Sequence, residues 1–150
     1  MDKMDRKILS ELQKDGRLSL TELSERIGLS LSPCHRRMRA LEEAGVIADY
    51  RATINPLAVG LGFSAIVFVT LKSTDRGSVR AFEDAVPAVP AIVQAQRLFG
   101  DPDFMLHVLT TDLAAFQKLY DECLSALPSV MRLTSTLVMK SIIQNRPLPI

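Results

Sequence analysis

The chain has 150 residues, a formal net charge of +1 and a hydrophobic fraction of 47%. This composition is typical of a folded globular protein and excludes a disordered chain. No apolar run approaches the roughly 18 residues of a membrane span, and the charged start MDKMDRKILSEL is not a secretory signal. We therefore expect a cytoplasmic protein with no membrane partner. The distant cysteines Cys34 and Cys123 indicate small buried residues rather than a disulfide or a metal site, and we expect no cofactor.

Residues 1 to 45 carry the apolar spacing of three short helices. In the first, apolar side chains recur every three or four residues from Met4 to Leu12. In the second, Ser19 and Glu22 have the spacing of a capping box. A third helix is capped by Ser30 or Ser32, which are residues suited to a helix N-terminus. The glycines that we expect to end these helices are Gly16, Gly28 and Gly45.

From Val46 the apolar period becomes that of strands. Residues 46–54 predict a short hairpin or strand, and NPLAVGLG, residues 55–62, predicts a hinge. The remainder predicts strands over 63–72, 91–99, 103–110 and 130–143, with helices over 76–86 and 113–127. This βαββαβ order is typical of an α+β, ferredoxin-like sheet with both helices on one face. We expect domain boundaries at 1–50, 51–62 and 63–150.

The third predicted helix concentrates positive charge on one side. At 100° per residue, its apolar arc faces the first two helices and contains Leu31, Cys34, Met38 and Leu41. The opposite arc contains Ser32, His35, Arg36 and Arg39, and Arg37 lies at its edge. Residues 1–50 contain nine Lys and Arg and nine Asp and Glu, so the net charge of this segment does not indicate a nucleic-acid ligand. The concentration of basic side chains on one face of the third helix does.

A basic outer face on the helix that follows a short glycine-containing turn is typical of the recognition helix of a helix-turn-helix. Arginine donates to guanine O6 and N7 together, or grips a phosphate. Ser32, near the helix N-terminus, can contact a phosphate with the help of exposed backbone N–H groups. The alternative is a solvated helix face with no ligand.

Two segments resemble one known family. MDRKILSELQKDGRLSLTELSERIGLSLSPCHRRMRALEEAGVIADYRATINP is similar to the N-terminal half of the Lrp/AsnC transcription regulators, and FGDPDFML, LPSV and STLVMKSII are similar to their C-terminal amino-acid-sensing domain. The resemblance covers essentially the whole chain. It implies a winged helix-turn-helix, a connecting strand and a RAM-type sensor domain that builds homodimers and often octamers. The implied function is sequence-specific regulation of transcription, with assembly or DNA affinity responding to an amino-acid effector.

The resemblance also implies an effector site at the contact between dimers. In the family, the turn that here reads GDPD and the start of the last strand frame this pocket. Backbone N–H groups there hold the effector carboxylate, and an aspartate takes its ammonium. By position the candidates are Arg97, where some relatives have an apolar residue, and Gly100, Asp101, Asp103, Thr136, Leu137 and Val138. From the residues alone, the alternatives are a plain turn whose aspartates bond their own backbone and a solvated arginine.

Two other classes of function stay open at this stage. An amino-acid-binding enzyme or regulatory subunit is disfavoured, because His35 and His107 lie in different halves and no nucleophile, base and acid have suitable spacing. His107, within the apolar segment FMLHVL, is expected to be a packed or interface histidine. A nucleoid-type architectural protein would bind DNA with weak specificity. Binding to its own upstream region, compared with random duplex, separates that class from a regulator.

Self-association is predicted from the strand FSAIVFVTL. Ala65, Val67 and Val69 alternate with Ile66 and Phe68, so both faces of the strand are apolar. Two helices cover only one face of a four-stranded sheet, and a large exposed apolar patch is rare on a monomer. We therefore expect at least a dimer, whose paired recognition helices would suit a pseudo-palindromic DNA site.

Overall fold

The computed structural model describes all residues from Met1 to Ile150. They form two compact units, one of residues 1–53 together with 143–150 and one of residues 54–142. Residues 143–150, which the sequence analysis places in the second domain, therefore pack with the first unit in the structure. None of the helices combines the length and the apolar character that crossing a membrane requires.

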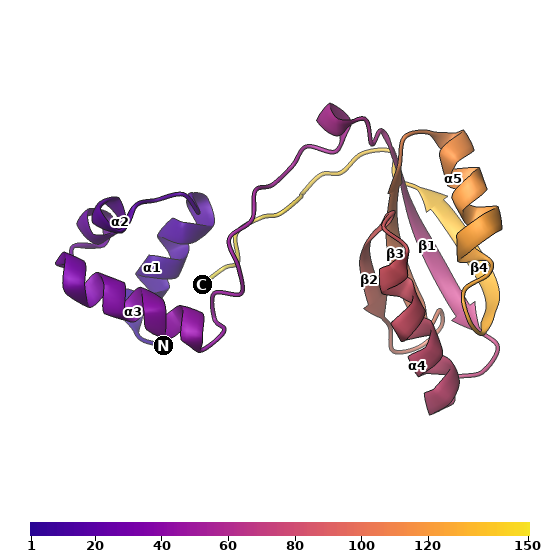
Figure 1. Ribbon diagram of the computed structural model, residues 1–150, viewed down its shortest axis with the longest axis horizontal. Helices are drawn as coiled ribbons and strands as arrows, with labels where there is room; N and C mark the ends of the chain where they lie inside the picture. Colours follow the sequence, from indigo (N-terminus) through magenta and orange to yellow (C-terminus); the bar gives the residue numbers. More distant parts are fainter. The chain divides into compact units, whose positions relative to one another are not determined.

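The first unit is built from three helices, α1 (Lys3–Lys14), α2 (Leu20–Ile27) and α3 (Leu31–Glu43) (Figure 1). The predicted capping box of α2 is present, because the Ser19 hydroxyl accepts from the Glu22 backbone N–H and the Glu22 carboxylate accepts from the Ser19 N–H. Gly28 follows α2 with a φ of 73°, a conformation that glycine adopts without strain. The core of the unit consists of Ile8, Leu23, Ile27, Cys34 and Leu41.

Two predictions about this unit are wrong. No strand forms between residues 46 and 53, because no neighbouring segment supplies a hydrogen-bonding ladder. Instead Tyr50 donates to the Glu42 carboxylate at 2.9 Å, and Arg51 pairs with Asp49 at 2.6 Å. Leu31 does not face the other helices: its side chain is 50% exposed, because it begins α3 one turn before the first buried residue, Cys34.

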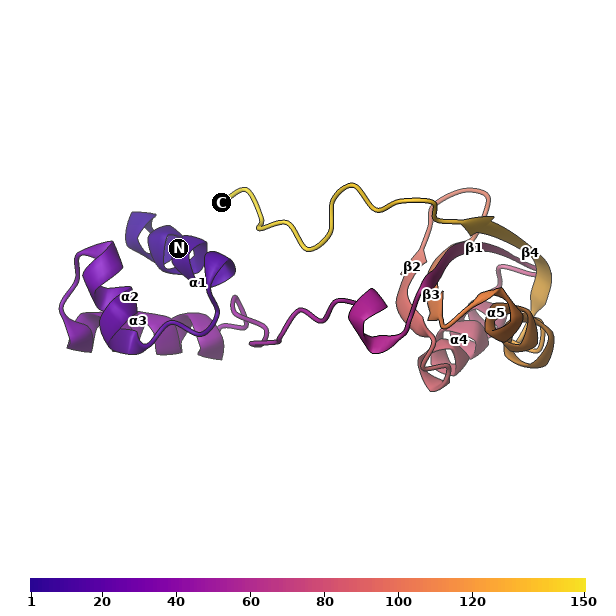
Figure 2. The ribbon, with the colours of Figure 1, turned by 90° about the horizontal axis from the view of Figure 1, so that it is seen from above.

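The second unit has the predicted βαββαβ order, with elements β1 (Phe63–Leu71), α4 (Arg76–Ala85), β2 (Ile92–Arg97), β3 (Phe104–Thr110), α5 (Leu113–Leu119) and β4 (Val130–Leu137). Its four-stranded antiparallel sheet has the order β2-β3-β1-β4. Figures 1 and 2 show both helices on the same face of the sheet. Alternate residues of β1 and β3, from Ala65 to Leu71 and from Phe104 to Val108, are buried under α4 and α5.

Two elements end much earlier than predicted. The last strand ends at Leu137 rather than at residue 143, because Leu137 already pairs with Ala65 and the partner strand β1 begins only two residues before that. The Val138 N–H still donates to the Ser64 carbonyl at 2.9 Å. The helix expected over 113–127 is α-helical only to Leu119, and a π-helical turn over Tyr120–Leu124 continues it.

The opposite face of the sheet carries no helix. Ile66 and Phe68 of β1 and Met105 and Leu109 of β3 lie there and are only partly buried. His107 lies among them, and its Nε2 is 2.8 Å from the Ser64 Oγ. Both faces of the central strands are therefore apolar, but only one face is covered within the chain.

Candidate nucleic-acid interface and ligand cavity

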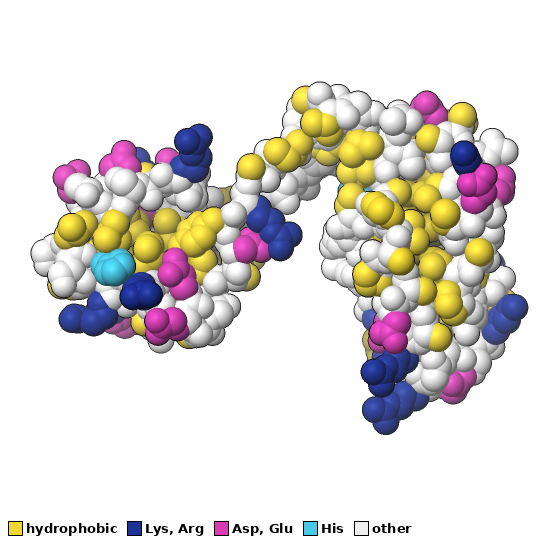
Figure 3. Space-filling model, viewed as in Figure 1, with side chains coloured by type: hydrophobic (Ala, Val, Ile, Leu, Met, Phe, Trp, Pro, Cys, Tyr) yellow, Lys and Arg dark blue, Asp and Glu magenta, His cyan; other side chains and the backbone are white.

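The outer face of α3 presents the polar side chains that the sequence singles out. Ser32, His35, Arg36 and Arg39 are all exposed, and neither Arg36 nor Arg39 makes an ion pair. The opposite side of the helix buries Cys34 and Leu41 in the core of the unit. Figure 3 shows Lys or Arg side chains beside a histidine on the side of this unit where α3 lies. Guanidinium groups with no internal partner keep all their donors available for a ligand.

Arg37 has a different environment from its two neighbours. Its Nη1 donates to Asp2 Oδ2 at 2.7 Å and to Asp5 Oδ1 at 2.8 Å, so it joins α3 to the N-terminus of α1. A hydrogen bond from the Asp5 N–H, together with that from Arg37, lowers the pKa of Asp2 to about 2. The hydrogen bonds that Arg37 donates to the Asp2 and Asp5 carboxylates raise the pKa of Arg37. This contact is not readable from the sequence, because Asp2 and Arg37 lie 35 residues apart.

Three of the effector candidates, Arg97, Gly100 and Asp103, line one cavity of about 520 Å³ in the second unit. The cavity lies where β2 ends and β3 begins. Asp103 is fixed by two hydrogen bonds to β1: its Oδ2 accepts from the Leu71 N–H at 2.7 Å, and its N–H donates to the Val69 carbonyl at 2.9 Å. Its Oδ1 accepts no hydrogen bond. The other residues that line the cavity are Thr74, Val79, Leu98, Phe99 and Phe104.

Asp101 lies apart from Asp103, although only one residue separates them. It borders a different hollow, with Phe68, Thr70 and Thr134 from the helix-free face. Its Oδ1 accepts from Thr70 at 3.3 Å and is 3.8 Å from the Arg132 guanidinium. The turn therefore directs its two carboxylates to different surroundings.

Thr136, Leu137 and Val138 do not meet the GDPD turn within one chain. Val138 bonds to Ser64 at the start of β1, whereas Asp103 bonds to Val69 and Leu71 at its other end. At about 3.3 Å per residue, these positions are roughly 15–25 Å apart. The two segments lie at opposite ends of the strand that both contact, so a site that combines them requires two copies of the chain.

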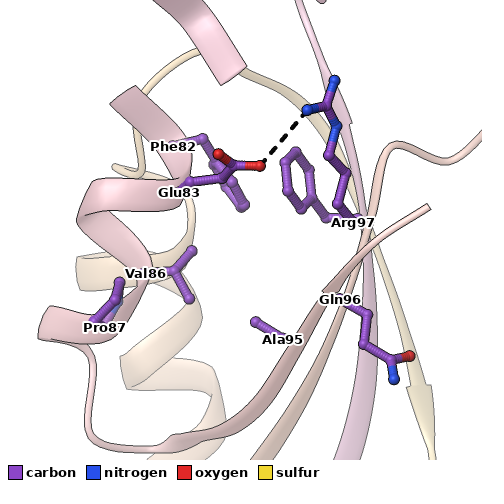
Figure 4. Close-up of a pocket in the computed structure, with 8 residues that line it drawn as sticks. Phe82, Glu83, Val86, Pro87, Ala95, Gln96 and Arg97 are labelled. Carbon is purple, nitrogen blue, oxygen red and sulfur yellow. Dashed lines mark ion pairs between the residues drawn. The ribbon is translucent and has the colours of Figure 1, made fainter. Parts of the chain in front are cut away.

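A second cavity, of about 260 Å³, lies between α4 and β2 (Figure 4). Phe82, Val86 and Pro87 line it from the helix side, and Ala95 lines it from the strand. Arg97 and Phe104 border both this cavity and the larger one. The Phe104 ring packs against Phe82 with 4.5 Å between centroids. The dashed line in Figure 4 joins Arg97 and Glu83, whose Nη1 and Oε1 atoms are 3.8 Å apart.

Sequence reasoning did not select the α4 residues that line these cavities. Glu83 lies on a helix whose spacing indicates only an amphipathic packing element, and no motif connects it with Arg97. Phe99 and Phe104 flank the GDPD turn and look like ordinary strand residues in the sequence. Their roles as lining residues become visible only when the antiparallel register brings α4, β2 and β3 together.

A three-helix unit with an exposed basic third helix, joined to a βαββαβ unit with a cavity, defines a DNA-binding regulator with a ligand-binding domain. Family comparison agrees: "Winged helix-turn-helix DNA-binding" matches residues 1–48, and "Lrp/AsnC ligand binding domain" matches residues 64–148. The chain belongs to the Lrp/AsnC family of transcriptional regulators, and this family consists of regulators rather than enzymes.

Individual relatives span almost the whole chain. A leucine-responsive regulatory protein of Rhizobium meliloti (strain 1021) is 39% identical over 95% of this chain and 91% of its own length. A proline dehydrogenase transcriptional activator of Rhodobacter capsulatus is 37% identical over 98% and 96%. Among solved structures, a Neisseria meningitidis transcriptional regulator in complex with L-methionine has a TM-score of 0.93 and 36% identity, over 99% of this chain and 96% of that one.

Proposed function

We propose that Arg36 and Arg39 carry the DNA contact of this regulator, with Ser32, His35 and Arg37 supporting them. The observation that carries this proposal is that both arginines are exposed on α3 and lack acidic partners. Arg36 and Arg39 can each read a base edge or grip a phosphate. Arg37 contributes mainly by fixing the position of α3, because its guanidinium is held by Asp2 and Asp5. The proposed functional parts are residues 1–50 for DNA binding, 51–62 as the connection and 63–150 for sensing, and the last eight residues of the sensing part pack with the DNA-binding unit.

Binding curves test the specificity of this contact. The full-length protein is titrated with a duplex of its own upstream region and with random duplex of equal length at one salt concentration. A regulator binds the former at least about a thousandfold more tightly, as specific DNA-binding proteins do. Equal affinity for both duplexes contradicts the proposal and favours an architectural protein.

An amino acid is the effector that the cavity favours. The relative from Neisseria meningitidis is described as an L-methionine complex, which supports a small amino acid as the ligand class. We propose a composite site, in which Arg97, Gly100, Asp101 and Asp103 of one copy meet residues 136–138 of another copy, since these segments are far apart within one chain. The ligand would then favour one assembly state over another, and this difference would couple it to DNA binding.

A thermal-shift screen of the twenty amino acids tests this proposal. A ligand that binds the native state raises its apparent stability by mass action. At least one amino acid should raise the melting temperature in a concentration-dependent way and change the affinity for the upstream duplex. If none of the twenty does so, the effector proposal is wrong.

Self-association is proposed to use the helix-free face of the sheet. Ile66, Phe68, Met105 and Leu109 present apolar side chains there, and a second copy would cover them around a two-fold axis. Higher assembly to an octamer would place the composite effector sites between dimers. As a DNA-binding protein it is proposed to act in the cytoplasm. Light scattering at micromolar concentration tests the association, and a monomeric mass contradicts it.

A further inference from the structure

Leu31 is an apolar residue at the start of the helix that is proposed to contact DNA. It is the first residue of α3, and it is 50% exposed. A single exposed leucine is common on protein surfaces and by itself indicates no ligand. Leu31 is informative because of the side chains that surround it on the helix surface.

Leu31 begins a row of exposed side chains along α3. Residues four positions apart are neighbours on a helix surface, so Leu31, His35 and Arg39 form one row, and all three are exposed. Ser32 and Arg36 form a second exposed row beside it. In Figure 3 the histidine of this unit lies between hydrophobic and basic side chains. The leucine therefore shares one surface with both arginines of the proposed DNA contact.

The beginning of α3 is not covered by the chain's own side chains. Asp2 and Ser19 cap the first turns of α1 and α2, whereas the Ser30 side chain makes no capping hydrogen bond to α3. In helix-turn-helix proteins, the N-terminal residues of the recognition helix contact base edges in the major groove. Leu31 therefore occupies a position from which a side chain reads bases.

We infer that Leu31 contacts the C5 methyl group of a thymine in the major groove and makes this position of the DNA site specific for thymine. A leucine side chain neither donates nor accepts hydrogen bonds, so it does not read the nitrogen and oxygen atoms of the base edges. The C5 methyl is the apolar group that distinguishes thymine in the groove. Contact removes water from the methyl group and from the exposed part of the leucine, which is favourable. This inference rests on the proposed DNA contact of α3.

The test uses two synthetic duplexes of the protein's own upstream region. They are identical except that deoxyuridine, which lacks only the C5 methyl, replaces every thymine in the second duplex. The unmodified full-length protein should bind the thymine duplex about fourfold more tightly for each methyl that Leu31 contacts, which is the effect of burying one methyl-sized group. Leu31→Ala should lose this factor on the thymine duplex and should bind the deoxyuridine duplex as tightly as the unmodified protein does.

Two control variants separate this role from a general effect of losing an exposed leucine. Leu113 is the first residue of α5 and is 61% exposed, so Leu113→Ala is the same substitution at the same helix position in the other unit. It should leave both affinities unchanged. Leu31→Met keeps a flexible apolar side chain and should keep the preference for the thymine duplex. All three variants should retain the melting temperature of the unmodified protein, because the substituted side chains are exposed.

The outcomes distinguish the inference from the proposal on which it rests. The inference is wrong if the unmodified protein binds both duplexes equally, or if Leu31→Ala keeps the full preference for thymine. It is also wrong if Leu31→Ala weakens binding to both duplexes by the same factor, which would show a structural role in α3. Each of these results leaves the proposed arginine contacts in place. If the unmodified protein binds its upstream region no more tightly than random duplex, the proposed DNA contact itself is wrong, and the inference falls with it.

Discussion

The arginines of α3 have two kinds of environment, and the difference predicts two kinds of mutant. Arg36 and Arg39 have no internal partner, so Arg36→Ala or Arg39→Ala should leave folding intact and weaken DNA binding. The loss should be about 1–3 kcal/mol where the arginine reads a base. Where it grips only a phosphate, binding should weaken uniformly and the salt slope should fall by about one. Mobility-shift assays at several salt concentrations measure the loss of binding free energy and the salt slope. Normal DNA binding by the double mutant contradicts the proposal that these two arginines contact DNA.

Arg37→Ala should instead lower the stability of the DNA-binding unit. It removes the hydrogen bonds to Asp2 and Asp5 that join α3 to the N-terminus of α1. Urea unfolding followed by circular dichroism should show a lower midpoint for Arg37→Ala than for Arg36→Ala, which is the matched control. The lowered pKa of Asp2 determines how the stability of this unit changes with pH. Its stabilising contribution is present above the ordinary value of 3.8 and is lost as pH falls towards about 2.

The Asp103 carboxylate accepts a hydrogen bond from the Leu71 N–H and is also proposed to contact the ligand. The substitution that tests the ligand contact must therefore preserve this hydrogen bond. Asp103→Ala would leave the Leu71 N–H without its acceptor and would disturb the fold. Asp103→Asn keeps an oxygen for that N–H and removes the negative charge. We expect Asp103→Asn to retain its melting temperature and basal DNA binding and to lose most of the effector-induced thermal shift. A full shift in this variant contradicts the role of the carboxylate.

At the scale of elements, the sequence predicted those features that depend on neighbouring residues, such as helix caps. The α2 capping box and the left-handed Gly28 depend on neighbouring residues and were readable from the sequence. The end of β4 depends on where β1 begins, and the absent strand over 46–53 depends on a missing partner, so neither was readable. The candidate site follows the same rule. The basic face of α3 follows from helical periodicity, whereas Glu83 and the separation of Asp101 from Asp103 depend on tertiary register.

The C-terminal segment is an element whose contact gives a further prediction. The Gln13 side chain donates to the Leu148 carbonyl and accepts from the Leu148 N–H, so residues 143–150 attach to α1 through a paired amide contact. Gln13→Ala removes both bonds and should increase hydrogen exchange at the Leu148 amide to the rate of a free chain. Gln13→Asn, with a shorter side chain, is the graded control. Unchanged protection at Leu148 contradicts this attachment.

At the scale of the whole molecule, the helix-free face carries one titratable group at its centre. His107 faces Ser64 and Ile66 from β1 and Gln94 from β2, and none of these is charged. Burial lowers the pKa of His107, so the folded chain favours the neutral ring. Because a second copy on this face would bury the ring further, the proposed dimer should hold it neutral more strongly. Arg132 and Asp101 pair near the turn at the other end of β1.

The sign of the resulting pH dependence follows from proton binding. An unfolded chain takes up a proton near the ordinary His pKa of 6.5. In the folded single chain burial lowers the pKa of His107, and in the proposed dimer further burial should lower it more. Association should therefore be full at neutral and higher pH, where the ring is neutral in both states, and should weaken as pH falls through the lowered His107 pKa of the single chain. Sedimentation at about pH 8 and about pH 5.5, within the range where histidine titrates, should show more dissociation at the lower pH. His107→Gln, which retains a polar group beside Ser64 but does not titrate there, should remove the difference, and an unchanged pH response in that variant would show that another group controls assembly.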